Sequence, residues 1–192
     1  MEGGALPSHI ALLLHQKYID RVLSVTVSRG TEEIEGYGFI FFKDGGWVST
    51  IVDDQLFYGI NRQSFKTSLC FGACRDECKT WLSLLEKAYV KIHGDYKSID
   101  GGYTAEGIED LLGVIPSIIC SADILSKDRF WDGEMRQVNR TLFMGCAIAH
   151  VDIDGQMDKH GIQSSHAYSV LRVEEHKGGH FVQLRDPWGR VE

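Results

Sequence analysis

A histidine and an aspartate in the last thirty residues carry the chemistry that this sequence offers. His166 begins a β-branched and aromatic run, and Asp186 ends the next such run, with a turn near Lys177 and Gly178 between them. Two such runs predict an antiparallel hairpin. Both residues then lie at the end of the hairpin away from the turn, where cross-strand and diagonal neighbours are within about 8 Å. We therefore expect the Asp186 carboxyl to orient the His166 imidazole, as nucleophilic catalysis requires of its general base.

Spacing by itself leaves a structural interpretation open. A histidine near a strand end is more often a surface or core residue than a catalyst, and the Asp-Pro-Trp-Gly tetrapeptide at 186–189 is typical of a turn. Three runs rich in β-branched and aromatic residues predict the strands that would position His166 and Asp186. They lie at 142–151, 165–175 and 180–186.

The first half of the chain predicts a hairpin and helices. Two apolar runs, 37–42 and 47–52, flank a glycine-containing turn and indicate a β-hairpin. Apolar residues at i, i+3, i+4 and i+7 predict an amphipathic helix over 78–92, packed through Trp81, Leu85 and Tyr89 and ended by Gly94. Further helices are expected at 10–23, from an N-cap at Thr104 to Gly113, and around 129–139.

This order of elements predicts an α+β fold in two lobes. We expect a helical lobe over residues 1–100 and an antiparallel-sheet lobe over residues 101–192, with the boundary near Gly101 and Gly102.

The composition is that of a globular protein and excludes several kinds of partner. The 192 residues are 43% hydrophobic and 24% charged, with a net charge of -7 and no basic block. This argues against nucleic acid and anionic membrane surfaces as partners. No segment approaches the roughly 20 apolar residues of a membrane span, and the N-terminal stretch lacks the basic region of a secretory signal. Five cysteines, an odd number, are expected to be reduced thiols in a cytoplasmic protein.

Four segments, in the same order, resemble the catalytic core of the calpains, which are papain-like cysteine endopeptidases. They are YGFIFFKDGGWVSTIVDD, WLSLLEKAYVKIHGDYKSIDGGYTAEGIEDLLG, SSHAYSV and VQLRDPWGRVE, and together they span roughly residues 36–192. The resemblance implies a papain-like fold in which a helical lobe faces a sheet lobe across a cleft, with intracellular proteins or peptides as substrates. By the same resemblance, His166 matches the catalytic base and Trp188 the tryptophan that shields its hydrogen bond. Asp186 falls where the family has the asparagine that fixes the imidazole.

The nucleophile that the family requires has no counterpart in this chain. Papain-like enzymes place the cysteine roughly 130–150 residues before the histidine and asparagine, and matching the hairpin onto the family puts that position near Gly3. The first cysteine here is Cys70. Three explanations are open. We favour the first, in which the chain is a fragment or the product of a faulty gene model. In the second it is a pseudopeptidase that binds peptides or a partner protein, and in the third its nucleophile comes from a separate segment. As given, it is expected to be inactive.

Two further positions depart from the family. A carboxylate at 186 accepts the imidazole hydrogen bond as an amide does, so this change is expected to be tolerated. The resemblance implies calcium, with an acidic ligand two residues before Trp81, but Lys79 stands there and offers no oxygen. Glu192 matches an acidic position of the second calcium site of the family. Calcium dependence is therefore doubtful for the first lobe and undecided for the second.

Overall fold

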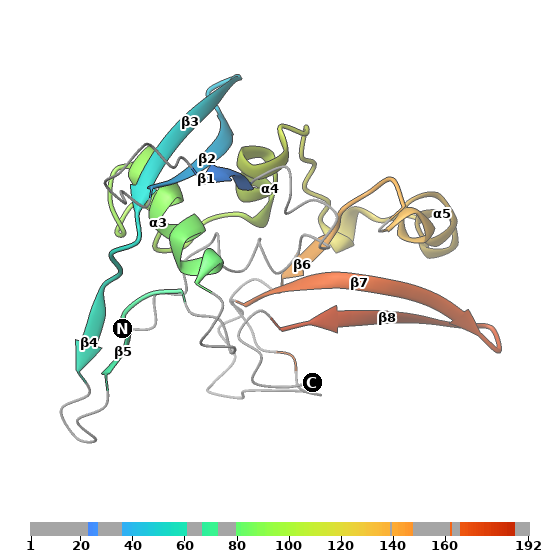
Figure 1. Ribbon diagram of the computed structural model, residues 1–192. Coiled ribbons are helices and arrows are strands. Elements are labelled where there is room, and N and C mark those ends of the chain that lie inside the picture. The colour runs from blue at the N-terminus through green and yellow to red at the C-terminus, as the bar shows by residue number, and fades with distance from the viewer. Residues whose placement is uncertain are drawn as a thin grey trace. The chain divides into compact units, whose positions relative to one another are not determined.

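In the computed structural model of the chain, the residues described are 23–26, 36–60, 67–72, 80–138, 140–147, 162 and 166–186. The chain divides into two compact units, Met1–Pro116 and Ser117–Glu192. Helices and strands occur in both units (Figure 1). The α+β class is therefore confirmed.

The first unit contains a three-stranded antiparallel sheet in the order β1-β2-β3, with strands Leu23–Thr26, Gly36–Lys43 and Gly46–Asp53. β2 and β3 form the hairpin that the sequence predicted, and Phe42 pairs with Trp47 beside the turn. Both central turn residues have positive φ, 52° at Asp44 and 80° at Gly45. Such turns match the right-handed twist of the flanking strands, and so they fix the hairpin register.

Two helices pack in the same unit. α3 (Trp81–His93) contributes Leu82, Leu85 and Tyr89 to a core that also holds Phe39 and Phe41 of β2, and Trp81 packs against the edge of this core. The predicted packing side of this helix is confirmed. The Gly94 N–H donates to the Val90 carbonyl at a φ of 108°, a conformation that favours glycine and ends the helix.

α4 spans Thr104–Leu112. Thr104 was predicted to be its N-cap but is its first helical residue. The N-cap is Tyr103, and no side chain caps the helix. Gly113 ends α4 in the left-handed conformation, with its N–H donating to the Glu109 carbonyl. A second hairpin, β4 (Tyr58–Ile60) and β5 (Thr67–Leu69), completes the described part of the unit.

The second unit is built on the antiparallel sheet β6-β7-β8, with strands Gly145–Ala147, Ala167–His176 and Gly179–Arg185. Lys177 and Gly178 form the β7–β8 turn, as predicted, with φ of 51° and 75°. Before the sheet come two 3-10 turns, η1 (Ser121–Asp123) and η2 (Met135–Gln137), and the helix α5 (Lys127–Gly133).

The third predicted helix is shorter than expected. The apolar pattern predicted a helix around 129–139, but α5 ends at Gly133 and a separate 3-10 turn, η2, follows from Met135. Glycine favours the end of a helix more than its interior, because it loses the most backbone freedom on folding. The buried Trp131 belongs to α5, whereas Val138 follows η2.

The sequence predicted a helical lobe over residues 1–100 and a sheet lobe over residues 101–192, which is more than the two units show. The first unit holds β1 to β5 as well as α3 and α4, so its described part is not purely helical. The predicted lobe boundary and the papain-like arrangement of the lobes stay predictions. The predicted helix at 10–23 falls, up to residue 22, outside the described residues, and its last residue, Leu23, begins β1 instead. None of the helices in the described ranges has the length and apolar character of a membrane-spanning segment.

Candidate active site

His166 and Asp186 meet at the open end of the β7–β8 hairpin. His166 directly precedes β7, and Asp186 directly follows β8. The His166 Nε2 atom lies 2.8 Å from Oδ1 of Asp186. Their side chains are 6% and 8% exposed, so water screens the pair little. The predicted proximity is confirmed, whereas the catalytic roles of both residues stay predictions.

The strand register explains why these two side chains meet. Ser169 pairs with Arg185 at the end of the ladder. One residue further, the same register sets Asp186 opposite Tyr168, which is one diagonal step from His166 on the same face of β7. Further along, Leu171 is an extra residue between the pairs that Val170 and Arg172 make with β8. Such bulges increase the local twist of a strand, and they are frequent beside functional sites.

The hydrogen bond fixes the tautomer of the neutral imidazole. An ionised carboxylate only accepts hydrogen bonds, so Nε2 carries the proton that is donated to Asp186. The lone pair of the neutral ring then lies on Nδ1. The pair can therefore accept a proton at Nδ1 while Asp186 stabilises the charge that develops on the ring.

Tyr168 packs on the imidazole, a contact that the sequence did not single out. The two ring centroids are 4.9 Å apart at an interplanar angle of 88°, an edge-to-face arrangement. Tyr168 is buried, at 7% exposure. The signal was present, because residues i and i+2 of a strand share a face, but strand alternation alone does not say that the rings touch.

The described thiols differ from a catalytic cysteine. Cys70, Cys120 and Cys146 are free and exposed. Cys146 of β6 pairs with Tyr168 of β7, so it lies on the sheet that carries His166. Partial burial of its sulfur raises the pKa of Cys146, although the residue as a whole reaches solvent. A nucleophilic thiol requires a lowered pKa, so this environment favours a structural role.

Several residues of the predicted site lie outside the described residues. They are Trp188, which was expected to cover the pair, and the two calcium-related positions, Lys79 and Glu192. Within the described ranges, no three histidine, cysteine, aspartate or glutamate side chains group closely enough to hold a metal ion. Whether the chain binds calcium stays a prediction.

A second histidine–carboxylate pair lies in the first unit and serves a different purpose. His93 Nε2 is 3.1 Å from Oδ2 of Asp110, and Lys43 Nζ is 3.1 Å from Nδ1 of the same ring. The Tyr89 hydroxyl donates to the same Asp110 oxygen at 2.5 Å. Because both ring nitrogens are engaged, His93 has no lone pair left for a substrate proton. This cluster connects β2, α3 and α4.

Glu86 of α3 is the most deeply buried carboxyl of the described residues, at 1% exposure. Its Oε2 accepts a hydrogen bond from the Gly72 N–H at 2.6 Å, while Oε1 is buried with no hydrogen-bond partner in the described chain. Burial raises the pKa of Glu86 to about 7, although the Gly72 hydrogen bond opposes this shift. A Cβ atom at Gly72 would lie 2.7 Å from Oε2, so the Glu86 carboxylate would have to move to admit a side chain there.

Comparison with known proteins identifies the family of the chain. The sequence model of the calpain family cysteine proteases matches residues 6–192. Human calpain-14 is 31% identical over 188 residues, which cover 95% of this chain and 26% of calpain-14. A calpain of Schistosoma mansoni is 34% identical over 168 residues, covering 84% of this chain and 21% of that protein. The rice calpain-type cysteine protease ADL1 is 32% identical over 187 residues, covering 94% and 8%.

The chain thus spans about a quarter or less of the length of these curated relatives. The match extends over nearly all of its residues, including His166, Asp186 and the strands β7 and β8 beside them. The chain belongs to the calpain family of cysteine proteases.

Proposed function

We propose that this chain supplies the histidine half of a calpain-type cysteine endopeptidase site that acts on intracellular proteins. The observation that carries the proposal is the buried His166–Asp186 hydrogen bond of 2.8 Å. In this proposal Nδ1 of His166 takes the proton of a thiol, and the imidazolium later protonates the leaving amine. Asp186 holds the ring in place, and Trp188 covers the hydrogen bond between them.

The reaction needs a thiolate that this chain does not supply. The thiolate attacks a backbone carbonyl, an acyl-enzyme forms with release of the amine, and water then hydrolyses the acyl-enzyme. An imidazole with a carboxylate can polarise water but cannot form the acyl-enzyme. Losing the nucleophile of such a constellation removes several orders of magnitude of rate. We therefore propose that the polypeptide as given is inactive, with or without calcium.

A second candidate function is that of a pseudopeptidase, whose site binds extended peptides or a partner protein without cutting them. The observation that favours it is the cysteine set itself, because the first cysteine is Cys70 and the thiol beside the His166 strand, Cys146, has a raised pKa. In this case the buried pair would be a structural remnant of the family's site.

The test begins with the purified chain. It is incubated with an unfolded protein substrate and with a thiol-directed activity probe, with calcium and with a chelator. We expect no cleavage, and no labelling of any cysteine that depends on His166. Labelling that His166→Ala abolishes would identify a nucleophile among the five cysteines and overturn the inactive assignment.

A chimera separates the two candidate functions. In the chimera, the cysteine-bearing segment of a relative such as human calpain-14 replaces residues 1–35. Cleavage of the unfolded substrate is then measured. The endopeptidase proposal expects activity that is lost in His166→Ala. A folded chimera that carries the cysteine, binds peptide and does not cut would favour the pseudopeptidase. A matched His180→Ala chimera should cut like the parent, because His180 lies at the far end of the hairpin.

A further inference from the structure

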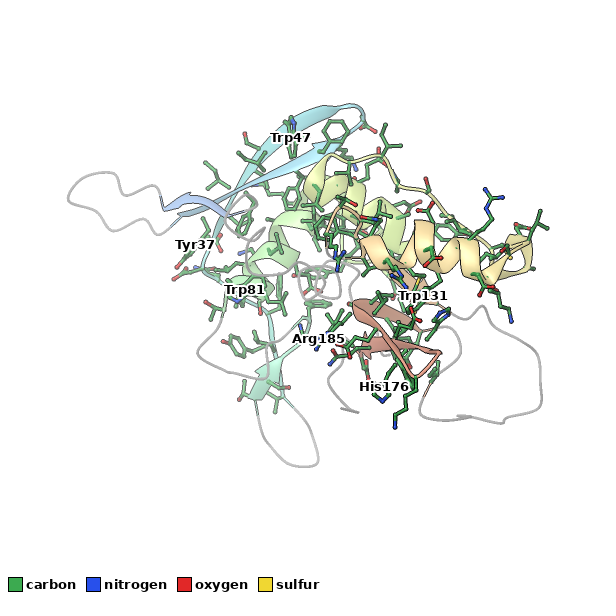
Figure 2. All side chains as sticks on the ribbon, turned by 90° about the vertical axis from the view of Figure 1, so that its right-hand side faces the viewer. Tyr37, Trp47, Trp81, Trp131, His176 and Arg185 are labelled. Atoms are coloured by element: carbon green, nitrogen blue, oxygen red, sulfur yellow. The ribbon has the colours of Figure 1, made fainter. Side chains whose placement is uncertain are left out.

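A hollow of about 420 Å³ lies in the second unit, beside η2 and β7. Its apolar lining comes from Trp131, Val138, Leu171 and Val173. Trp131 is 5% exposed, and its ring stacks on His180 of β8 at 4.1 Å between centroids and 5° between planes. Figure 2 labels Trp131 between α5 and this hairpin. The stacked His180 ring covers one side of the indole.

The charged lining of the hollow has one cation in excess. Three arginines and two glutamates line it, which gives 3 − 2 = +1. Arg136 pairs with Glu175 at 2.5 Å and with Asp132, which lies outside the lining, at 3.1 Å, and Arg172 pairs with Glu174. The remaining cation, Arg140, makes no ion pair with any residue in the described ranges. The two glutamates are therefore compensated, and Arg140 supplies a guanidinium whose donors suit a carboxylate.

The same lining also holds a buried hydrogen-bond donor. The indole Nε1 of Trp131 is buried and has no hydrogen-bond partner among the described residues. A buried N–H without an acceptor costs about 1–3 kcal/mol, so such groups are rare in native structures. An acceptor oxygen that enters the hollow would offer this N–H the partner that it lacks.

From these observations we propose that the hollow binds a carboxylate joined to an apolar group, as found in an acidic peptide. The carboxylate pairs with Arg140 and accepts from the Trp131 indole, while the apolar group covers Val138, Leu171 and Val173. Two sources carry this chemistry, the C-terminal carboxylate of a peptide and the side chain of an internal Asp or Glu beside an apolar residue. None of the lining residues belongs to the His166–Asp186 pair, so the proposal does not depend on catalysis.

The test uses the indole N–H itself as the reporter. The chain has four tryptophans, so its indole region in a ¹H–¹⁵N spectrum is simple, and Trp131→Phe assigns the Trp131 signal. The ¹⁵N-labelled chain is titrated with N-acetylphenylalanine, with N-acetyl-Phe-Glu-amide and with neutral N-acetylphenylalaninamide. We expect a saturable downfield shift of the Trp131 N–H with one or both acids and none with the neutral amide. The acid that binds more tightly identifies the source of the carboxylate.

Two arginine variants test whether Arg140 supplies the positive charge that binds the carboxylate. Arg140→Gln should weaken binding about tenfold or more, since a hydrogen bond to a charged group contributes about 1.5–3 kcal/mol. Arg129→Gln, an exposed change on α5 outside the lining, should leave the titration unchanged. The proposal is overturned if neither acid shifts the Trp131 signal, if the neutral amide shifts it equally, or if Arg140→Gln binds like the parent chain.

Discussion

Nε2 of His166 lies 2.8 Å from Oδ1 of Asp186, with both side chains more than nine-tenths buried. The bond joins the residue before β7 to the residue after β8, so the strand register holds both groups in place. A carboxylate stands here where the calpain resemblance implies an amide. Unlike an amide, an ionised carboxylate has no donor, and so the N–H must belong to the histidine.

The first prediction concerns that hydrogen bond. In the parent chain the Nε2 proton of His166 should give a strongly downfield ¹H resonance, coupled to a ring nitrogen, because the proton is donated to a carboxylate. Asp186→Asn should keep a weaker bond and move the resonance upfield, whereas Asp186→Ala should remove it. A spectrum in which Nδ1 carries the proton in the parent chain would contradict this geometry and the proposed base.

The second prediction concerns Tyr168. Its ring meets the imidazole edge to face, and aromatic pairs of this kind contribute about 0.5–1.5 kcal/mol beyond their burial. Tyr168→Phe should keep the ring contact and the downfield His166 resonance. Tyr168→Leu should broaden or shift that resonance, because the imidazole loses one of the groups that orient it. If Tyr168→Leu folds with an unchanged His166 signal, Tyr168 only fills space.

Local sequence patterns were enough to predict part of the structure. The β2–β3 and β7–β8 hairpins follow from β-branched runs on either side of turns that accept positive φ. The meeting of His166 and Asp186 follows from that register. Each of these features needs only neighbours within one hairpin.

Features that depend on distant parts of the chain were not predicted. Glu86 lies in a helix whose apolar pattern gave no reason to bury a carboxyl, and its partner Gly72 is 14 residues earlier. The contacts among Lys43, His93 and Asp110 join strand β2 to two helices that come much later in the chain. The apolar pattern around 129–139 continues past Gly133, but the α-helix ends there and a 3-10 turn follows. The periodicity shows which face of a helix is apolar, and it does not show which backbone conformation the chain adopts.

The third prediction tests the Asp110 cluster. Asp110 accepts from both Tyr89 and His93, so Asp110→Ala leaves two donors without their acceptor in a partly buried site. We expect a loss of about 2–4 kcal/mol in the free energy of unfolding, measured by urea denaturation. Asp110→Asn keeps an acceptor oxygen and should lose less. Asp100→Ala, an exposed change nearby in sequence, should be close to neutral. Equal stability of Asp110→Ala and the parent would show that the cluster contributes nothing.

The last prediction concerns the pH dependence of stability and rests on Glu86. Burial raises the pKa of this carboxyl from 4.5 to about 7 in the folded chain, so the folded state binds the proton more tightly than the unfolded state does. The stability that this proton provides is fully present below about pH 4.5, and it is lost as the pH rises from 4.5 to about 7. The pKa difference of 7 − 4.5 = 2.5 corresponds to a loss of about 3 kcal/mol by pH 7.

Glu86→Gln removes this ionisation and keeps an oxygen that accepts from the Gly72 N–H. The variant should therefore be more stable than the parent above pH 7, with the difference shrinking steadily as the pH falls toward 5. Urea denaturation of both proteins at intervals across this range measures the difference directly. Glu106→Gln, on α4, is the matched control, and its difference from the parent should not follow this curve, because Glu106 is exposed. A Glu86→Gln variant that is less stable than the parent at pH 8 would mean that the ionised carboxylate stabilises the fold, and the assignment of a raised pKa would then be wrong.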